Sequence, residues 1–197
     1  MLFITVILIY FVLIVTAIPT ITYDGNACPD IVCNMFQGMG FTTSGTYTRI
    51  NPPDVDGNYN TYIHTVFNPV THKPVKIREC TNKVKMRLIS ANRRVTCSTK
   101  KCSSSNTNDI TLECDEFPLA STYQGGRGAF TRCIQKWQNG LAGIDIRIFY
   151  QQKKIADNAP FTINLINVPF NCPETDDRTI LKQTPSAGQS TCAIKPF

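Results

Sequence analysis

Nine cysteines constrain the fold of this chain more than any other feature of its sequence. Residues 1–17 of the 197 are almost entirely apolar and end in Val15-Thr16-Ala17, as a secretory signal peptide does. An uncleaved signal anchor is the alternative, because no Lys or Arg precedes the long apolar run. All nine cysteines lie in the remaining 180 residues (197 − 17). We therefore expect a secreted, extracellular protein that is braced by disulfides and has no stable membrane association after cleavage.

Eight of the nine cysteines can pair, which leaves one over. Proximity in the sequence predicts the pairs Cys28 with Cys33, Cys97 with Cys102, Cys114 with Cys133, and Cys172 with Cys192, so that Cys80 is unpaired. The two C-x4-C spacings are alternatively half-sites for structural zinc, although an oxidising compartment favours disulfides. The odd cysteine also permits an intermolecular bridge.

The positive charge is concentrated in one segment. Residues 71–101 hold ten of the 20 basic residues and a single acid, Glu79. Lys83, Lys85 and Arg87 alternate with apolar residues, which predicts a strand with three cations on one face. Such a face would bind a polyanion by releasing counterions from its phosphates. A solvated face that protects an edge strand from aggregation is the alternative.

Turn residues and short alternating runs predict a largely β chain. Residues 18–62 are rich in Gly, Asn, Pro and Thr and are expected to be irregular or short-stranded, without chemistry. Periodicity fits both a strand and a helix over residues 141–153. Short strands, the first four as a meander, are predicted at 61–67, 75–79, 83–90, 94–98, 110–114, 129–135 and 161–165.

A pair of carboxylates stands where the strand over residues 110–114 ends. Asp115 and Glu116 precede Phe117-Pro118 and a glycine loop at residues 125–128. Consecutive strand residues point to opposite faces, so the two carboxylates share a ligand only if the backbone bends, as the proline would allow. One would accept the proton of an attacking water and the other would bind a metal or orient a neighbour. A solvated strand end is the alternative.

The Asp-Glu-aromatic-Pro-x-Ala run and its glycine loop resemble the signature of the secreted NucA/NucB family of metal-dependent deoxyribonucleases. Residues 137–143 are similar to the family's Asn and small-residue turn that opens a helix, and residues 155–165 to its Asp-Gly turn and last strand. The resemblance is to a fungal-like member with additional cysteines and covers about residues 107–169.

The resemblance implies an α+β fold, a mixed antiparallel β-sheet with a disulfide-braced ββα-metal-type nuclease core, in which residues 141–153 are helical. We expect one domain over residues 18–197. Its parts would be a basic β-rich segment (18–106), the catalytic core (107–169) and a disulfide-held tail (170–197).

The resemblance also implies the roles of individual residues. Asp115 would activate water, and Glu116 would support the site. Asn139, also catalytic, and Asp145 would hold a divalent cation, Mg²⁺ or Mn²⁺, against the scissile phosphate, since these ions prefer oxygen ligands. A solvated helical position is the alternative for Asp145. Arg127, Arg132 and Lys136, with Lys83, Lys85 and Arg87, are the predicted substrate contacts, and solubility is their alternative role.

Two positions depart from the family pattern. The acid expected before Asn139 is Gln138, and the Gln expected before the helix glycine is Ala142. Trp137 would stack on a base or pack in the core. Both histidines, His64 and His72, lie upstream of the motif, so a histidine-based site would have to be assembled by folding.

The sequence thus predicts an endonuclease that cuts nucleic acid, DNA in preference to RNA, with little sequence specificity and no implied protein partner. A secreted toxin or effector ribonuclease with the same site is one alternative, because readers of the 2′-hydroxyl are not visible in sequence. A non-catalytic polyanion-binding protein on a nuclease scaffold is the other.

Overall fold

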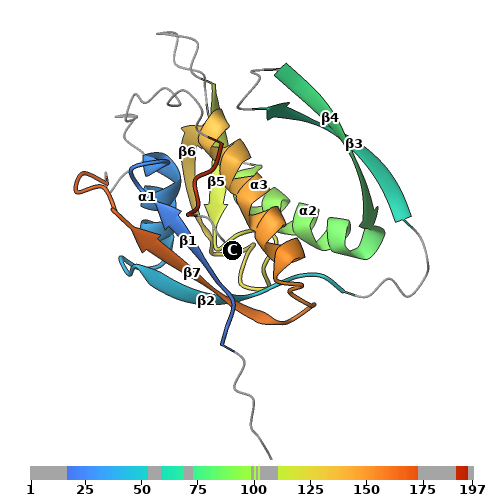
Figure 1. Cartoon of the computed structure of the whole chain (residues 1–197), viewed down its shortest axis with the longest axis horizontal. Helices are drawn as coiled ribbons and strands as arrows, with labels where there is room; N and C mark the ends of the chain where they lie inside the picture. Colours follow the sequence, from blue (N-terminus) through green and yellow to red (C-terminus); the bar gives the residue numbers. More distant parts are fainter. Residues whose placement is uncertain are drawn as a thin grey trace, which may run out of the picture.

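The computed structural model describes residues 17–52, 59–68, 73–98, 100, 102, 111–172 and 190–194, and of residues 59–83 it describes the backbone alone. The elements in chain order are β1 (Thr20–Asp24), α1 (Pro29–Gly38), β2 (Ser44–Thr48), β3 (Tyr59–Asn68), β4 (Lys73–Asn82), α2 (Lys83–Cys97), β5 (Leu112–Phe117), β6 (Phe130–Gln135), α3 (Lys136–Gln152) and β7 (Pro160–Ile166). Figure 1 shows their arrangement.

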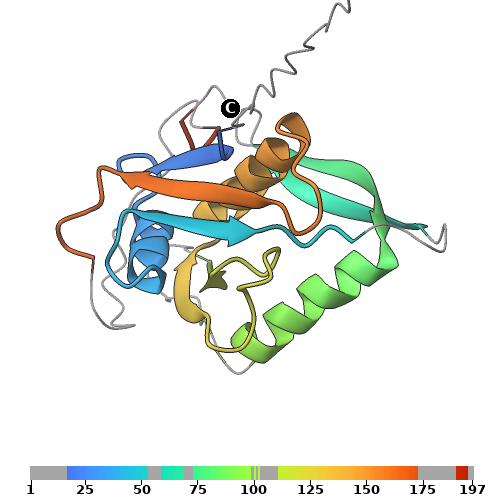
Figure 2. The same ribbon diagram turned by 90° about the horizontal axis from the view of Figure 1, so that it is seen from below.

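A mixed three-stranded sheet forms the base of the fold. Its order is β1-β7-β2, with β1 parallel and β2 antiparallel to the central strand β7. Alternate residues of β7, among them Phe161 and Ile163, are buried, whereas Thr162 and Asn164 lie on the other face beside polar residues of β2. The apolar face packs against α1 and α3, as Figures 1 and 2 show. The sheet is therefore covered by helices on one side, as its period-two pattern requires.

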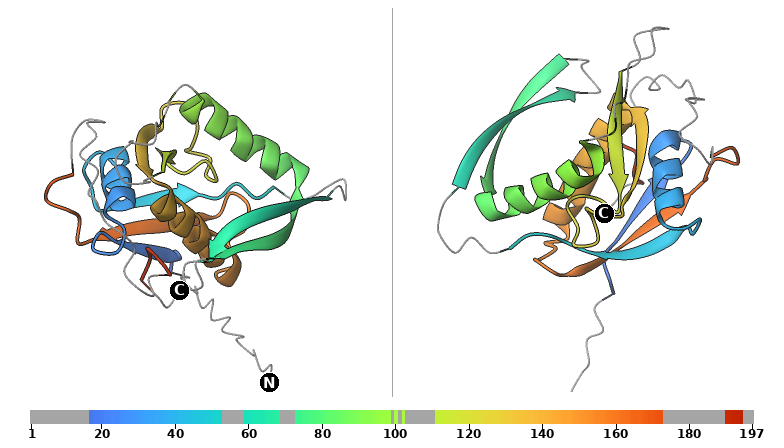
Figure 3. Two further views of the ribbon diagram at one scale, coloured as in Figure 1. Left: turned by 90° about the horizontal axis from the view of Figure 1, so that it is seen from above. Right: turned by 180° about the vertical axis from the view of Figure 1, so that it is seen from behind.

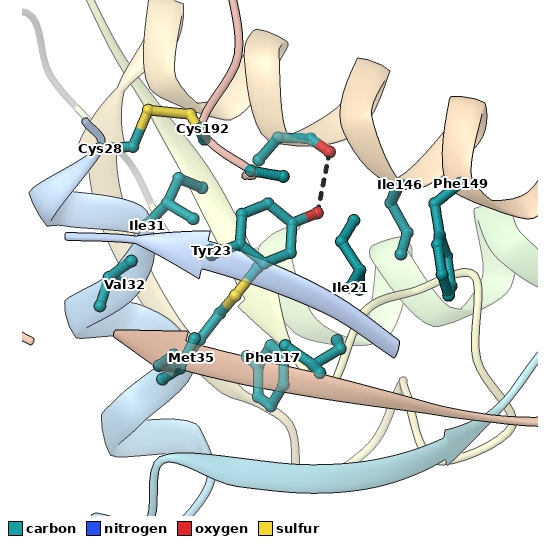
Figure 4. Close-up of a cluster of buried hydrophobic side chains, with 14 of the residues drawn as sticks. Ile21, Tyr23, Cys28, Ile31, Val32, Met35, Phe117, Ile146, Phe149 and Cys192 are labelled. Atoms are coloured by element: carbon teal, nitrogen blue, oxygen red, sulfur yellow. Dashed lines mark hydrogen bonds between the residues drawn. A yellow bond between two sulfur atoms is a disulfide. The ribbon is translucent and has the colours of Figure 1, made fainter. Parts of the chain in front are cut away.

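The core between the sheet and the two helices is apolar and partly aromatic. Figure 4 shows Ile21 and Tyr23 of β1 facing Ile31 and Met35 of α1, with Phe149 of α3 beyond. The Tyr23 hydroxyl satisfies its polar group by donating to the carbonyl oxygen of Ala142 at 3.3 Å.

A second β unit, the β5–β6 hairpin, carries the two predicted carboxylates inside β5, which continues to Phe117, so the prediction that the strand ends at residue 114 is wrong. The strands are antiparallel, and Asp115 lies opposite Arg132. The helix α3 begins at Lys136, directly after β6 ends at Gln135. The predicted return strand and the helix that the resemblance favoured are both confirmed, and the helix starts five residues before the predicted position 141. The hairpin lies between α1 and α2 (Figures 1 and 3).

The segment with most of the basic residues is only partly β-structured. The predicted strands at 61–67 and 75–79 are confirmed as β3 and β4, which pair as a hairpin. The predicted strands at 83–90 and 94–98 are wrong, because residues 83–97 form the single helix α2. This stretch contains no Gly or Pro and is rich in good helix formers, which outweigh a short alternating run. In a helix Lys83 and Arg87 are one turn apart and Lys85 points elsewhere, so the three cations do not share one face.

The expectation that residues 18–62 are irregular or short-stranded is confirmed for the short strands β1 and β2 and wrong for the helix α1. These residues include the sheet strands β1 and β2, the helix α1 and the first part of β3. Pro29 at the first position of α1 favours helix initiation, since its fixed φ suits that position and its missing N–H is not needed there.

Four disulfides brace the fold and use the eight cysteines that the sequence predicted. All four predicted pairings are wrong: the bonds are Cys28–Cys192, Cys33–Cys172, Cys97–Cys114 and Cys102–Cys133. Cys114 and Cys133 do face each other in the β5–β6 register, yet each bonds a cysteine outside the hairpin. The disulfides of Cys28 and Cys33 join cysteines that are 164 and 139 residues apart, which proximity in the sequence does not predict.

No helix in the part of the chain that the structure describes is long and apolar enough to cross a membrane. The predicted signal peptide, apart from Ala17, lies outside the described residues, as do the side chains of His64 and Cys80 and all of His72.

Candidate active site

Asp115 and Glu116 are neighbours in β5 and face opposite helices. Asp115 points toward α1, where Asn34 contacts it, and Glu116 points toward α2, where Arg93 contacts it. The exposed fractions of Asp115 and Glu116 are 6% and 4%. The opposite orientation is what strand geometry predicts, and the two covering helices explain why both carboxylates are nevertheless buried.

The environment of Asp115 favours its neutral form. Asn34 Nδ2 donates a hydrogen bond to Asp115 Oδ2 at 2.6 Å. Burial, followed by the charge of Glu116, raises the pKa of Asp115 to about 7, and the Asn34 hydrogen bond and the Arg93 charge oppose this rise. A carboxyl group with this pKa exchanges protons near neutral pH.

Glu116 is joined to an exposed cation. Arg93 Nε lies 3.2 Å from Glu116 Oε1, and the side chain of Arg93 is 65% exposed. The Sγ atom of Cys97, one helical turn beyond Arg93, lies 3.4 Å from Glu116 Oε2. Burial raises the pKa of Glu116, and the Arg93 guanidinium opposes that rise. The pair therefore links a buried carboxylate to the surface.

The turn after β5 is held by α2. Asn92 Nδ2 donates to the carbonyl oxygens of Ala120 at 3.0 Å and Thr122 at 3.4 Å. Gly126 has a φ of +97°, and a Cβ added there would lie 2.6 Å from Asn92 Oδ1. The glycine loop is thus needed both for its backbone conformation and for its close approach to α2.

A buried polar network joins the beginnings of α1 and α3. Gln138 Oε1 accepts hydrogen bonds from the backbone N–H groups of Asp30 at 2.9 Å and Ile31 at 3.3 Å, and Gln138 Nε2 donates to Asp30 Oδ2 at 3.2 Å. Burial raises the pKa of Asp30. An amide at position 138 can both donate and accept, whereas a carboxylate there would face the Asp30 carboxyl. The departure from the family pattern at Gln138 therefore fits this interface.

The two predicted metal ligands lie in different surroundings. Asp145 is 1% exposed. Its carboxylate accepts hydrogen bonds from Thr191 Oγ1 and the N–H of Cys192, both at 2.7 Å, and from the N–H of Ala193 at 3.0 Å. Asp145 thus fixes the C-terminal segment to α3.

Asn139 lies at the edge of the hairpin. Its Nδ2 donates to Glu113 Oε2 at 3.2 Å, and Lys136 Nζ is 3.3 Å from Glu113 Oε1. Fixing the amide nitrogen in this way leaves Asn139 Oδ1, an oxygen of the kind that Mg²⁺ and Mn²⁺ prefer, as the candidate ligand atom. Within the described ranges, no group of three or more His, Cys, Asp and Glu side chains is placed to hold a metal ion.

The predicted phosphate contacts differ in their exposure to solvent and in their partners. Arg127 and Arg87 are exposed, Lys136 is exposed and paired with Glu113, and Lys85 is half-buried. Arg132 is buried, and its Nη1 donates to Gln37 Oε1 at 3.3 Å, so it braces the α1–β6 contact. The side chain of Lys83 lies outside the described part. Trp137 packs against the core and donates to Gln135 Oε1 at 2.6 Å, as its packing alternative predicted.

Sequence reasoning missed two residues that contact the carboxylates. Arg93 belongs to the basic segment, but only the helical form of α2 brings it to Glu116. Asn34 is separated from Asp115 by 81 residues and lies in a segment that was expected to carry no chemistry.

Residues 69–164 match the family model of Deoxyribonuclease NucA/NucB. This part of the chain belongs to the NucA/NucB family. The match confirms the resemblance seen in the motif and extends it upstream through α2 and β4. The NucA/NucB domain includes both carboxylates and Arg93, whereas α1 lies outside the matched residues. A search of curated proteins finds no match to the chain.

Proposed function

We propose that the protein is a secreted, metal-dependent endonuclease that hydrolyses the phosphodiester bonds of DNA with little sequence specificity. The observation that carries the proposal is the buried Asp115, whose pKa is raised to about 7, on β5 of a domain that matches the NucA/NucB family. The β5–β6–α3 order supports the further proposal that this domain has a ββα-metal-type core.

Asp115 is the proposed general base. A base is most effective when its pKa is near the working pH, because it is then largely ionised and yet able to bind a proton. At about pH 7 half of the Asp115 carboxyl groups are ionised. The ionised form would take a proton from the attacking water, and the water oxygen would form the new bond to phosphorus as the P–O bond to the leaving oxygen breaks.

Arg93 is the proposed phosphate contact. Its Nε is bound to Glu116, and its exposed side chain leaves the terminal nitrogens for a ligand. Guanidinium groups match phosphate oxygens in a bidentate geometry, and a bound carboxylate fixes their orientation. Glu116 would thus orient Arg93 while Arg93 stabilises the charge that builds up on the phosphate.

The family implies a divalent cation, Mg²⁺ or Mn²⁺. We propose Asn139 Oδ1 as its ligand from this chain and do not retain Asp145, whose oxygens hold the C-terminal segment. Mg²⁺ keeps several waters in protein sites and binds substrate phosphate, so Asn139 Oδ1 would be one oxygen ligand beside these. When bound, the cation would neutralise charge on the leaving oxygen.

The preference for DNA rests on the family match. Exposed Arg87, Arg93 and Arg94 on α2 would add affinity for phosphates that is independent of sequence and falls with salt. Secretion, with cleavage after Ala17 to give one domain over residues 18–197, is supported by the four disulfides, which persist in oxidising compartments.

Incubation of the mature protein with plasmid DNA and with total RNA tests this function. We expect Mg²⁺ or Mn²⁺ to support DNA cutting, and EDTA and Asp115→Ala to abolish it. Cutting of RNA alone would favour the toxin or effector ribonuclease. Salt-sensitive DNA binding without cutting by the correctly disulfide-bonded protein would instead favour a binding protein on a nuclease scaffold.

A further inference from the structure

Helix α1 lies outside the family-matched residues, yet it supplies the hydrogen bond to Asp115. Asn34 Nδ2 reaches Asp115 Oδ2 at 2.6 Å. Asn34 is fully buried, and its Oδ1 atom has no hydrogen-bond partner. A buried amide oxygen without a donor costs free energy, and an apolar side chain would avoid that cost. The contact with Asp115 is thus the hydrogen bond that the buried Asn34 amide makes here, and packing alone does not require an amide at this position.

The position of Asn34 is fixed by covalent and polar contacts at both ends of α1. Cys28, just before the helix, is bonded to Cys192, and Cys33, the neighbour of Asn34, is bonded to Cys172. Gln138 accepts hydrogen bonds from the first N–H groups of the helix, and Gln37 near its end contacts Arg132 of β6. The amide thus meets Asp115 from a rigid support, which is what orientation of a reacting group requires.

The charged and titratable groups around Asp115 come from several elements. Glu116 is on the same strand, Arg93 acts from α2, Tyr23 from β1, Arg132 lies opposite on β6, and Asp30 is one turn before Asn34 on α1. Each of these side chains carries a charge or gains or loses one as the pH changes. Asn34 is neutral at every pH, so its hydrogen bond orients the carboxyl without adding a titration of its own.

We propose that Asn34 is the positioning residue of the active site: it holds Asp115 Oδ2, so that Oδ1 is presented to the attacking water. This inference rests on the proposed function, because it assumes that Asp115 is the base. It assigns a part of the site to the N-terminal region, which is joined to the rest of the fold by two long-range disulfides.

Asn34→Ala and Asn34→Asp test the proposal, with Val32→Ala as the matched control. Val32 is a fully buried residue of the same helix in the apolar core. Two quantities are measured in each variant: the pH dependence of kcat/KM for plasmid cutting, and the NMR titration of the Asp115 carboxyl carbon, assigned by its loss in Asp115→Asn.

We expect Asn34→Ala to lower kcat/KM about ten-fold or more and to raise both the acid limb and the NMR midpoint by about one pH unit, because a hydrogen bond to the charged form is lost. Asn34→Asp preserves the shape of the side chain and raises both further, since it places a second carboxyl beside Asp115. Val32→Ala lowers the thermal midpoint and moves neither quantity.

An unchanged acid limb and NMR midpoint in both Asn34 variants would overturn the proposal, because a purely structural residue behaves in that way. If the wild-type protein cuts no nucleic acid, the proposed function is overturned, and with it any catalytic role for Asn34, even where the Asn34 variants shift the NMR midpoint of Asp115.

Discussion

Arg93 and Glu116 join α2 to β5 at the candidate active site, with 3.2 Å between Nε and Oε1. The guanidinium is mostly exposed and the carboxylate is buried, so the pair is asymmetric in solvation. Solvent screens the exposed Arg93 side chain, which limits how much the attraction within the pair adds to stability. The value of this contact therefore lies in orientation: a buried acid fixes a surface cation beside the proposed base.

Comparing Arg93→Ala with Arg94→Ala separates the effect of an arginine oriented by Glu116 from the effect of one positive charge on α2. Both remove one exposed cation from α2, but only Arg93 contacts Glu116. We expect Arg93→Ala to reduce kcat/KM about 10- to 100-fold, as loss of a contact to transition-state charge does. Arg94→Ala should weaken DNA binding slightly and mainly at low salt. If the two variants lose similar amounts of kcat/KM in steady-state assays at two ionic strengths, the orienting role of Glu116 is contradicted.

The activity should depend on pH near neutrality. Burial and the Glu116 charge raise the pKa of Asp115 to about 7. If Asp115 is the base, kcat/KM rises with pH and reaches its half-maximal value near pH 7. The Arg93 charge lowers the pKa of Asp115, so Arg93→Ala should move the acid limb of the pH profile to higher pH. Arg93→Lys keeps a positive charge near the two carboxyl groups and should move the acid limb less. A pH profile that is flat between pH 5 and about pH 8 would exclude Asp115 as the base.

The stability of the fold should fall as pH rises through the same range. The folded state binds the Asp115 proton more tightly than the unfolded state, whose pKa is near 3.8. The stabilisation due to this proton is therefore fully present below about pH 4 and is lost as pH passes about 7. Burial raises the pKa of Glu116 and Asp30 in the same direction.

Asp115→Asn should remove the largest part of this loss, because the amide is neutral and can still accept from Asn34. Urea unfolding between pH 5 and about pH 8 should show the variant gaining stability over wild type with pH, by up to a few kcal/mol. A constant difference across that range would show that Asp115 keeps an ordinary pKa.

Asp145 and Asn139 should have separable roles. Asp145→Ala leaves the N–H of Cys192 without an acceptor and takes one of two acceptors from the N–H of Ala193 and from the Thr191 hydroxyl, so we expect a loss of about 1–3 kcal/mol in the free energy of unfolding. Asn139→Ala should change stability by less than about 1 kcal/mol, since its contact is half-exposed, but raise the Mn²⁺ concentration needed for half-maximal cutting at least about ten-fold. Calorimetric Mn²⁺ titration of both variants checks this. Weaker Mn²⁺ binding in folded Asp145→Ala alone would reverse the assignment.

The disulfides Cys97–Cys114 and Cys102–Cys133 offer a matched comparison. They close separations of 17 and 31 residues, so their entropic contributions to stability are similar, about 3–4 kcal/mol each. Cys97 is one helical turn from Arg93 and touches Glu116. The double variant Cys97→Ala/Cys114→Ala should therefore lose more kcat than Cys102→Ala/Cys133→Ala when both are assayed well below their melting temperatures. Equal losses would show that the first bond does not position Arg93.

How far the fold was predictable depends on the range of the interactions that decide it. The hairpin around the glycine loop and the last strand follow from local patterns, the helix after β6 follows from the family resemblance, and all three are present. The six-residue alternation at the start of α2 was misleading, because six residues are too few to tell a strand from a helix. The full 15-residue stretch forms one helix. The polar positions Asp30, Asn34 and Gln37 have the spacing of a solvated helix face, yet each is buried against the β5–β6–α3 unit.

By itself the sequence determined the family signature, the order of a strand, two carboxylates and a glycine loop, and the eight cysteines that pair. These features depend on residues close together in the chain, where steric and hydrogen-bonding preferences act directly. The tertiary structure alone decided which cysteines bond, that Asp145 holds the C-terminal segment, and that Asn34 and Arg93 reach the carboxylates. Such contacts depend on how the helices pack on the hairpin, because side chains far apart in sequence meet only after the core has formed.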